Sequence, residues 1–358
     1  MKMISRRDFL KASAVVGATA AMTACGGSSN NSAAGSTAAS GAAAAAGGSF
    51  NLKLGHNLAE DHAVHIQLTS FAEQVKEKTN GTVNIQIIPN GTLGSESDMI
   101  SQIQAGALDM AKVSASTLGN FSEKYNAFSV PYVFDDQAHY YTYMDSDSAQ
   151  AVFESTDDQG FRGLTWLDSG TRSFYTVKTP VNQPSDLKGL KIRVQQSPTN
   201  VEMMRLLGGT ATPMGFGDVY TALQAGILDG AENNELALTD NGHGDICKYY
   251  SYDMHQMVPD LLVANYEFLQ NLSDEERSIF EEGFQIVNET ERAAWEDAVA
   301  AAKDKAENDQ HVNFLYPDTA PFQEAMAPLH SEVLSSNPEL QPVYDLIQEY
   351  NAEYTSTN

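Results

Sequence analysis

The sequence predicts an α/β fold made of two similar lobes, for three reasons. From residue 50 onward, segments with strand-like alternation are followed by segments with helical spacing, which is typical of a mostly parallel sheet. The end of one helix, at residues 104–109, returns almost unchanged at residues 224–229. After Ser273, helical periodicity continues for about 35 residues without a proline. At roughly 150 residues per domain, a chain of 358 residues has room for about two domains.

The first 24 residues have the composition of an export signal. Basic residues precede a short apolar run at 12–24, and this run is too short to cross a bilayer as a helix. Residues 5–11, Ser-Arg-Arg-Asp-Phe-Leu-Lys, match the twin-arginine export signature at each defined position. We therefore predict export by the twin-arginine route, and a general secretory signal that happens to carry two arginines is the alternative.

Cys25 lies where an exported lipoprotein would be processed. Residues 22–26, Met-Thr-Ala-Cys-Gly, resemble a bacterial lipobox, although the first of them departs from the usual leucine. Residues 26–49 are almost entirely Gly, Ser, Ala, Asn and Thr, which is typical of a flexible linker. The sequence thus predicts a lipid on Cys25 that tethers a folded body to the outer face of the cell membrane. Without the lipid, the protein would be periplasmic.

The first lobe is expected to begin directly after the linker. Val83, Ile85 and Ile87 alternate with polar residues, which predicts a half-buried strand. Ser95 opens a helical segment, and Gly106 closes it. The expected elements are a strand at 51–55, a helix at 60–79, a strand at 82–89, a helix at 95–105 and a strand at 108–113.

The repeated helix end relates the second half of the chain to the first. Residues 104–109 read Gln-Ala-Gly-Ala-Leu-Asp, and residues 224–229 read Gln-Ala-Gly-Ile-Leu-Asp. In both, a glycine suited to the left-handed conformation ends a helix before a strand begins. Because ligands bind beyond the carboxyl ends of the strands in open α/β sheets, residues 113–116 and 232–234 are expected to face a common cleft. Chance similarity of two helix ends is the alternative.

The long helical segment has a clear beginning. Ser273-Asp-Glu-Glu276 is a capping box, and the periodic pattern continues to about residue 309. A helix of roughly 35 residues is about 50 Å long, which exceeds one small lobe. We expect it to brace both lobes.

The composition excludes several classes of function. The formal charge is −26, from 21 basic and 47 acidic residues; this argues against a nucleic acid or an anionic membrane surface as partner, because both require clustered cations. The two cysteines lie in different contexts, so no disulfide framework is predicted. Zinc-protease, serine-hydrolase and phosphate-loop motifs are missing from the sequence. We expect no enzymatic activity, no cofactor and no metal site, and an exported metalloenzyme is the remote alternative.

The densest group of metal-type side chains comprises His56, Asp61, His62 and His65. A spacing of three residues could place the last two histidines on one face of a helix. We interpret the group instead as the polar first turn of a surface helix, whose positive end favours Asp61.

Two arginines are informative because positive charges are scarce. Arg193 lies in the alternating segment 190–194, opposite its apolar residues, and Arg172 follows the strand-like segment 163–167. A guanidinium can hold a carboxylate through two parallel hydrogen bonds. In so acidic a chain, an anionic ligand needs such a local site. For each arginine, a solvated surface position is the alternative.

Residues 186–234 resemble the signature region of the DctP-type substrate-binding proteins of TRAP transporters. They read DLKGLKIRVQQSPTNVEMMRLLGGTATPMGFGDVYTALQAGILDGAENN, and the likeness extends from residue 51 to the C-terminus, including Leu93-Gly94, Pro131-Tyr132 and Gly170-Thr-Arg172. The resemblance implies a two-lobed periplasmic-binding-protein fold of the α/β class, type II-like, with a hinge and a long helix that bridges both lobes. The expected organisation is a signal peptide at 1–24, a linker at 25–49, lobe I at 50–169 and 258–297, and lobe II at 170–257 and 298–358.

The resemblance also implies a function and a set of binding residues. Members of this family are non-catalytic receptors that close around small organic acids and deliver them to an ion-driven membrane permease. By this likeness, Arg193 pairs with the ligand carboxylate, and Arg172 is a second arginine used by members that bind sialic acid or sugar acids. Phe216 matches a pocket aromatic and Asn233 matches the asparagine of a Gly-x-Glu-Asn motif. Glu96 falls where an acidic residue can meet ligand hydroxyls.

The expected ligand is a hydroxylated sugar acid such as a hexuronate. Ser114 stands where sialic-acid binders carry a glutamate, and Asn234 stands where many members have proline. Asn57 and His56 offer further polar groups for hydroxyls. Sialic acid, a C4-dicarboxylate and a role as partner of a sensory receptor remain the alternatives. We expect a monomer whose partners are the ligand and the permease subunits, with membrane contact only through the lipid anchor and with no nucleic acid.

Overall fold

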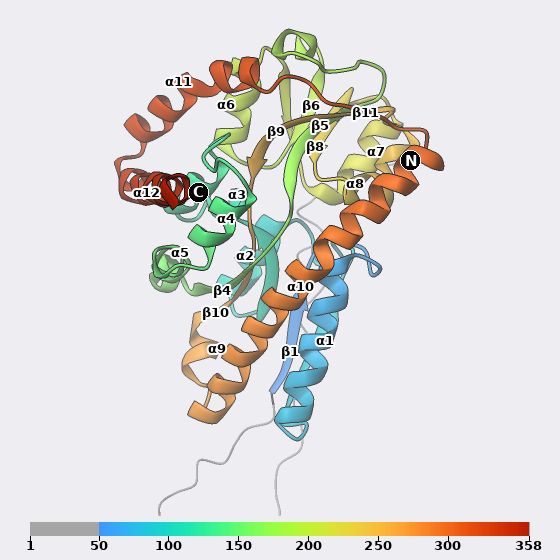
Figure 1. Ribbon diagram of the computed structural model, residues 1–358. Coiled ribbons are helices and arrows are strands. Elements are labelled where there is room, and N and C mark those ends of the chain that lie inside the picture. Colours follow the sequence, from blue (N-terminus) through green and yellow to red (C-terminus); the bar gives the residue numbers. More distant parts are fainter. Residues whose placement is uncertain (1–49, 358) are drawn as a thin grey trace, which may run out of the picture. The chain divides into compact units, whose positions relative to one another are not determined.

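The computed structural model describes residues 50–357, with side chains described as far as Asn351. The predictions for the export signal, Cys25 and the linker lie outside these residues. The described chain forms two β-sheets with helices packed around them (Figure 1). This is the mixed α/β architecture that the alternating sequence pattern predicts.

The first sheet, sheet A, has five strands. They are β1 (Phe50–Gly55), β2 (Val83–Ile88), β3 (Met110–Ser114), β4 (Phe161–Leu167) and β10 (Asp260–Asn265), in the order β2-β1-β3-β10-β4. β1 runs parallel to β2 and β3, whereas β10 is antiparallel to β3 and β4. The helices of this half are α1 (Ala63–Lys78), α2 (Glu96–Gln104), α3 (Ala115–Leu118), α4 (Gln137–Met144), α5 (Asp147–Phe153) and α9 (Tyr266–Gln270).

The second sheet, sheet B, has six strands. They are β5 (Thr171–Thr176), β6 (Lys191–Val194), β7 (Thr210–Pro213), β8 (Gly230–Asn233), β9 (Tyr249–Met257) and β11 (Asn313–Leu315), in the order β11-β9-β5-β8-β6-β7. Its short helices are α6 (Pro198–Leu206), α7 (Val219–Gln224) and α8 (Leu236–Thr239). β6 is parallel to both β7 and β8, just as β1 is parallel to both β2 and β3. Each sheet therefore contains the same unit of three parallel strands connected by helices.

The repeated helix end is confirmed in detail. Gly106 and Gly226 both have a φ of +68°, the left-handed conformation that glycine adopts without strain. Three residues later, a carboxylate oxygen of Asp109 accepts a backbone N–H from β1 at 2.8 Å, and Asp229 accepts one from β6 at 2.8 Å. The two copies therefore perform the same task in the two halves, which argues against chance similarity.

Three of the connections between the halves come before residue 309. The chain passes from β4 to β5 through residues 168–170 and from β9 to β10 through residues 258–259. The third connection is α10 (Asp274–Asn308), whose capping box and length of 35 residues agree with the prediction. α10 packs on α1 and β4 in one half and on α8 in the other, and Figure 1 shows it crossing both. The predicted lobe boundaries near 170 and 258 fall in the first two connections, and movement of the lobes stays a prediction.

The two C-terminal helices divide between the halves. α11 (Ala320–Ser336) packs on α6, whereas α12 (Gln341–Thr357) packs on α4 and α5. We expected residues 298–358 to belong wholly to lobe II, and the last helix corrects this. Its buried Val343 and Ile347 lie one helical turn apart and join the core, and Tyr350 meets Tyr143 of α4 with ring centroids 5.5 Å apart.

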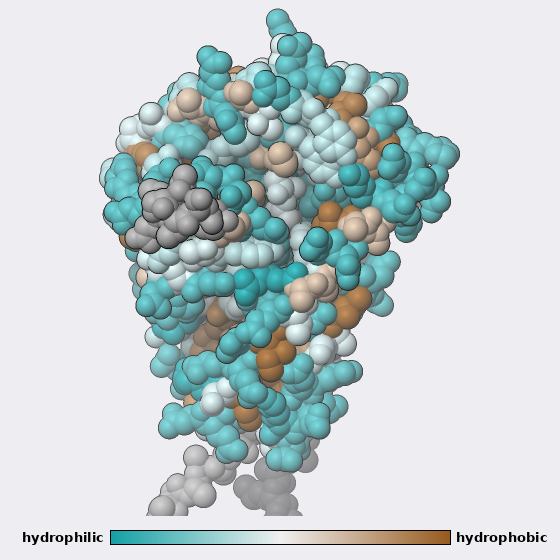
Figure 2. All heavy atoms as spheres, in the orientation of Figure 1, coloured by the Kyte–Doolittle hydropathy of each residue, from teal (hydrophilic) through white to brown (hydrophobic). Residues whose placement is uncertain are grey.

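The apolar residues lie mainly inside both halves. The core includes Leu54, Val113 and Leu262 of sheet A and Phe174 and Ile192 of sheet B, all fully buried. On the face drawn in Figure 2, hydrophilic side chains predominate and hydrophobic ones form small separate patches. Within residues 50–357, none of the helices is both long and apolar enough to span a membrane.

Candidate ligand-binding cleft

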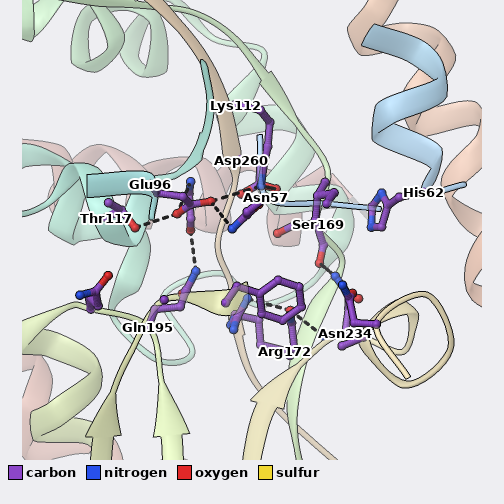
Figure 3. Close-up of a pocket in the computed structure, with 18 of the residues that line it drawn as sticks. Asn57, His62, Glu96, Lys112, Thr117, Ser169, Arg172, Gln195, Asn234 and Asp260 are labelled. Atoms are coloured by element: carbon purple, nitrogen blue, oxygen red, sulfur yellow. Dashed lines mark hydrogen bonds and ion pairs between the residues drawn. The ribbon is translucent and has the colours of Figure 1, made fainter. Parts of the chain in front are cut away.

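A polar cleft lies between the sheets, where the strands β1, β3, β6 and β8 end (Figure 3). Its unfilled space, counted out to the mouth and including open solvent, is about 670 Å³. The sheet A wall comprises Asn57, Leu58, His62, Glu96, Lys112, Ser114, Thr117 and Asp260. The sheet B wall comprises Arg172, Arg193, Gln195, Gln196, Met214, Gly215, Phe216, Asn233, Asn234, Ala237 and Asn241, and Ser169 and Trp295 complete the lining. The cleft therefore lies where the repeat predicts it.

Glu96 organises the sheet A wall. It is the first residue of α2, directly after the capping serine. Its Oε1 accepts from Asn57 Nδ2 at 3.2 Å and from Lys112 Nζ at 3.3 Å. Its Oε2 accepts from the Ser114 backbone N–H at 3.1 Å and from Thr117 Oγ1 at 2.8 Å. A carboxylate has about four acceptor positions, so Glu96 lines the cleft as predicted, but its bonding capacity already serves the protein.

Lys112 is a buried cation held between two carboxylates. Besides Glu96, its Nζ donates to Asp260 Oδ2 at 2.7 Å, and only 2% of the residue is exposed. Burial alone would lower the pKa of Lys112, but the two carboxylates outweigh it and raise the pKa. Burial raises the pKa of Asp260, and Lys112 opposes this shift. With one cation to two acids, the sheet A wall carries an excess of negative charge.

Arg172 is already paired on the sheet B wall. Its Nε donates to Glu232 Oε2 at 2.6 Å, its Nη2 to the Glu232 carbonyl at 2.9 Å, and its Nη1 to Asn233 Oδ1 at 2.9 Å. Burial alone would raise the pKa of Glu232, but Arg172 holds it down to about 2. The charge of Arg172 is thus neutralised inside the protein. The predicted second arginine lines the cleft but has little free charge to offer.

Arg193 is the cleft cation that lacks an acidic partner among residues 50–357. Its Nε and Nη2 donate to the carbonyl of Met214 at 3.2 and 3.0 Å, and its guanidinium lies 5.5 Å from the ring centre of Phe216. These bonds leave the hydrogens of Nη1 and one hydrogen of Nη2 for a further acceptor. Burial and the neighbouring Arg172 lower the pKa of Arg193. The alternation of residues 190–194 correctly predicted the face of β6 on which Arg193 lies. That face borders the cleft rather than open solvent.

The two predicted asparagines keep one polar atom each for a ligand. Asn57 donates through Nδ2 to Glu96, and its Oδ1 is buried without a hydrogen-bond partner. Asn233 accepts through Oδ1 from Arg172 and from the Asn234 backbone N–H, which leaves Nδ2 as a donor. Because an unpaired buried acceptor is costly, the Oδ1 of Asn57 is an acceptor on the cleft wall that the protein itself does not satisfy.

His56 is the predicted binding residue that the structure does not place on the cleft lining. It is fully buried, its Nε2 is 2.9 Å from His65 Nδ1, and its Nδ1 accepts from the Leu58 backbone N–H at 3.1 Å. His62 lines the cleft instead, because α1 begins at Ala63 and uses His62 as its N-cap. Burial lowers the pKa of both His56 and His62 to about 3. Within the described residues, no group of three or more metal-type side chains is arranged to hold an ion.

The two walls touch directly at one side of the cleft. Gln195 Nε2 donates to Ser114 Oγ at 2.8 Å, and Asn120 Nδ2 donates to the carbonyl of Gln196 at 2.6 Å. Asn234 Nδ2 donates to the carbonyl of Ser169 at 2.8 Å. The first two bonds join the sheet A half to the sheet B half across the cleft, and the third joins the sheet B wall to the connection at 168–170. Sequence reasoning did not single out Gln195, although its position after the strand of Arg193 is a signal for a cleft residue.

A two-sheet fold with a polar cleft at the strand ends, lined by an unpaired arginine, defines a receptor for a small anionic molecule. Residues 54–337 match the family of bacterial extracellular solute-binding proteins, family 7, also called DctP. The chain belongs to this family, which is one of solute receptors rather than enzymes. Residues 3–23 match the signal sequence of the twin-arginine translocation pathway, so the protein is exported.

Solved structures similar to this chain include periplasmic solute-binding proteins of TRAP transporters. One, from Anaerococcus prevotii with bound D-glucuronate, is 52% identical, covers 85% of this chain and 99% of its own, and has a TM-score of 0.83. Another, from a Sulfitobacter species with bound β-D-galacturonate, is 31% identical, covers 84% and 99%, and has a TM-score of 0.81. Among curated proteins, YiiZ of Salmonella typhimurium is 42% identical over 279 residues, 78% of this chain and 85% of YiiZ.

Proposed function

We propose that the protein is the solute receptor of a TRAP-type permease and captures a hexuronate such as D-glucuronate or D-galacturonate. The observation that carries the proposal is the isolated charge of Arg193 in the cleft, since the two other cations of the lining are neutralised by carboxylates. The uronates bound to the two similar receptors support the ligand class. No chemical change of the ligand is proposed.

The proposed contacts follow from the groups that the protein leaves unused. Arg193 holds the ligand carboxylate through the Nη1–Nη2 edge, a planar fork that suits two carboxylate oxygens. Phe216 packs against the ring of the sugar. Asn233 donates through Nδ2 to a ring or hydroxyl oxygen, and Asn57 accepts from a hydroxyl through Oδ1. Glu96 and Arg172 act mainly by holding the two asparagines in place.

Binding is tested by calorimetry and thermal unfolding with four acids: D-glucuronate, D-galacturonate, succinate and sialic acid. A ligand that binds only the folded protein at 100 times its Kd stabilises it by about 2.7 kcal/mol. Both uronates are expected to raise the unfolding temperature, and the other two acids are expected to have little effect at the same concentration. Tighter binding of succinate or sialic acid than of either uronate would exclude the hexuronate assignment.

Closure of two lobes about the connections at 168–170 and 258–259 is part of the proposal. The ligand touches both walls, so it binds the closed form better than the open form and shifts the population toward it. Small-angle scattering is expected to show a smaller radius of gyration with D-glucuronate than without it. Tight binding at unchanged dimensions would contradict closure.

The proposed cellular arrangement is a monomer anchored by a lipid on Cys25. The lipobox-like residues 22–26 and the linker after them support the anchor. Mass spectrometry of the protein purified from membranes of its native host is expected to find a diacylglyceryl group on Cys25 and to find it missing in Cys25→Ser. Recovery of the wild-type protein in the soluble exported fraction, without this modification, would refute the anchor.

A further inference from the structure

The two walls of the cleft differ in charge. This difference determines which chemical group the cleft accepts at the end of the ligand opposite its carboxylate. On the sheet A wall, Lys112 lies between the carboxylates of Glu96 and Asp260 at 3.3 and 2.7 Å, and it is 2% exposed. One cation among two acids leaves this wall negative. The sheet B wall carries the unpaired charge of Arg193. Figure 3 shows Glu96, Lys112 and Asp260 grouped on one side of the cleft and Arg172 on the other.

The acidic wall is close enough to the arginines to act on the same ligand. Gln195, which alternates onto the same face as Arg193, donates to Ser114 Oγ at 2.8 Å, and the Ser114 backbone N–H donates to Glu96 at 3.1 Å. A small acid held by Arg193 therefore directs its far end toward the sheet A wall. Whatever group lies at that end meets an excess of negative charge in a buried setting, where charge interactions are stronger than in water.

The hydrogen-bonding atoms left open on the sheet A wall are acceptors. The Oδ1 of Asn57 is buried without a partner. Asp260 uses Oδ2 for Lys112, which leaves Oδ1 as a further acceptor. A hydroxyl can donate to either oxygen. An ionised carboxylate has no hydrogen to donate, so it would leave both acceptors unpaired and add repulsion.

We propose that the sheet A wall excludes a second carboxylate, so that the receptor takes hydroxylated monocarboxylates and rejects the matching dicarboxylates in which the far terminal carbon is also oxidised. The inference rests on the proposed function, because it requires that Arg193 holds the single carboxylate. Sites built to pair a hydroxyl can reject an analogue that lacks it by about 10⁴ or more. Glu96 and Asp260 are the specificity-determining residues in this account.

The test uses two open-chain acids that differ at one end only. D-Gluconate ends in a CH₂OH group and D-glucarate ends in a second carboxylate, so ring shape does not enter the comparison. Both are titrated in competition with D-glucuronate at fixed pH and ionic strength. In the wild-type protein, glucarate is expected to bind at least about 100-fold more weakly than gluconate.

Two variants and one control locate the effect. Asp260→Asn and Glu96→Gln each remove one negative charge from the wall and are expected to reduce the gluconate preference at least about tenfold. Glu281→Gln removes the same charge from an exposed position on α10 and is expected to keep the wild-type preference. Thermal unfolding identifies any variant that fails to fold. Because each wall variant removes a different carboxylate, one folded variant is sufficient for the test.

The outcomes separate this inference from the function on which it rests. If the wild-type protein does not bind D-glucuronate, both the hexuronate assignment and the inference are wrong. If D-glucuronate binds and glucarate is within about threefold of gluconate, the hexuronate assignment stands and the inference is overturned. If neither folded wall variant gains glucarate affinity relative to gluconate, or if Glu281→Gln gains as much as they do, the inference is also overturned.

Discussion

Replacement of Arg193 by lysine is the most direct test of the carboxylate site. The guanidinium uses one hydrogen of Nε and one of Nη2 for the carbonyl of Met214, at 3.2 and 3.0 Å, and it lies over Phe216. These contacts orient the guanidinium so that its remaining Nη1–Nη2 edge can bind a planar carboxylate. Lysine keeps the charge but has no fork, so it cannot serve the carbonyl and a bidentate ligand in the same geometry. We expect the affinity for D-glucuronate to fall at least about tenfold, roughly 1.4 kcal/mol.

Arg193→Ala is expected to have a larger effect than Arg193→Lys. Removal of one partner of a buried ion pair costs about 3–5 kcal/mol, which corresponds to a loss of affinity of roughly a hundredfold to several thousandfold. Calorimetry with D-glucuronate measures both variants, and thermal unfolding verifies that they fold. Arg205→Lys is the matched control, because Arg205 is exposed and pairs with Glu202 on the same helix. Native affinity in a folded Arg193→Lys protein would refute the role of Arg193.

Three further predictions concern packing, pH and the contact between the walls. Gly230→Ala would press a methyl carbon against the carbonyl oxygen of Tyr175, and in urea titrations it should lower the free energy of unfolding by roughly 2 kcal/mol. Gly217→Ala, which has open space around it, should stay within about 0.5 kcal/mol of wild type. Burial alone would lower the pKa of His255, but neighbouring carboxylates raise it to about 9, so the stability that it contributes is complete below pH 6.5 and is lost as the pH rises through 9. The difference in unfolding free energy between wild type and His255→Gln should therefore shrink between pH 6.5 and 9. A difference that stays constant over this range would contradict a stabilising charge on His255. Gln195→Ala removes the 2.8 Å bond between the walls and should speed release of D-glucuronate about fivefold, roughly 1 kcal/mol, in stopped-flow experiments; an unchanged rate would show that this bond does not hold the cleft closed.

Local features of the fold could be predicted because they depend on residues close in sequence. The capping box at Ser273 predicts the start of α10, and its length follows from the absence of proline. The glycines at 106 and 226 predict where two helices end. Alternation around Arg193 predicts the face on which that side chain lies. In each case, the relevant contacts are within about one turn of helix or one strand.

The sheet A wall could not be predicted because it depends on distant pairing. Asp260 reaches Lys112 across 148 positions of sequence, through the antiparallel register in which Leu262 lies opposite Lys112. A shift of one residue in that register would turn Asp260 to the opposite face of the sheet. A lysine inside the buried strand of residues 110–114 is a signal that a buried acid must exist, but it does not say which one. His56 was misplaced because it directly follows β1 and is fully buried, with its Nε2 2.9 Å from His65 Nδ1.

The repeat explains why the cleft has two chemically different walls. The helix ends at 104–109 and 224–229 are 120 residues apart, and the same offset relates Lys112 to Glu232 and Glu96 to Phe216. Lys112 lies in β3 and Glu232 in β8, so corresponding strands of the two sheets carry groups of opposite charge. On sheet A, the strand cation is enclosed by carboxylates; on sheet B, the strand carboxylate is used by Arg172, and Arg193 stays unpaired. Under the proposed function, two similar strand-helix units thus give a site with direction, in which the carboxylate is held at the sheet B wall and hydroxyls face the sheet A wall.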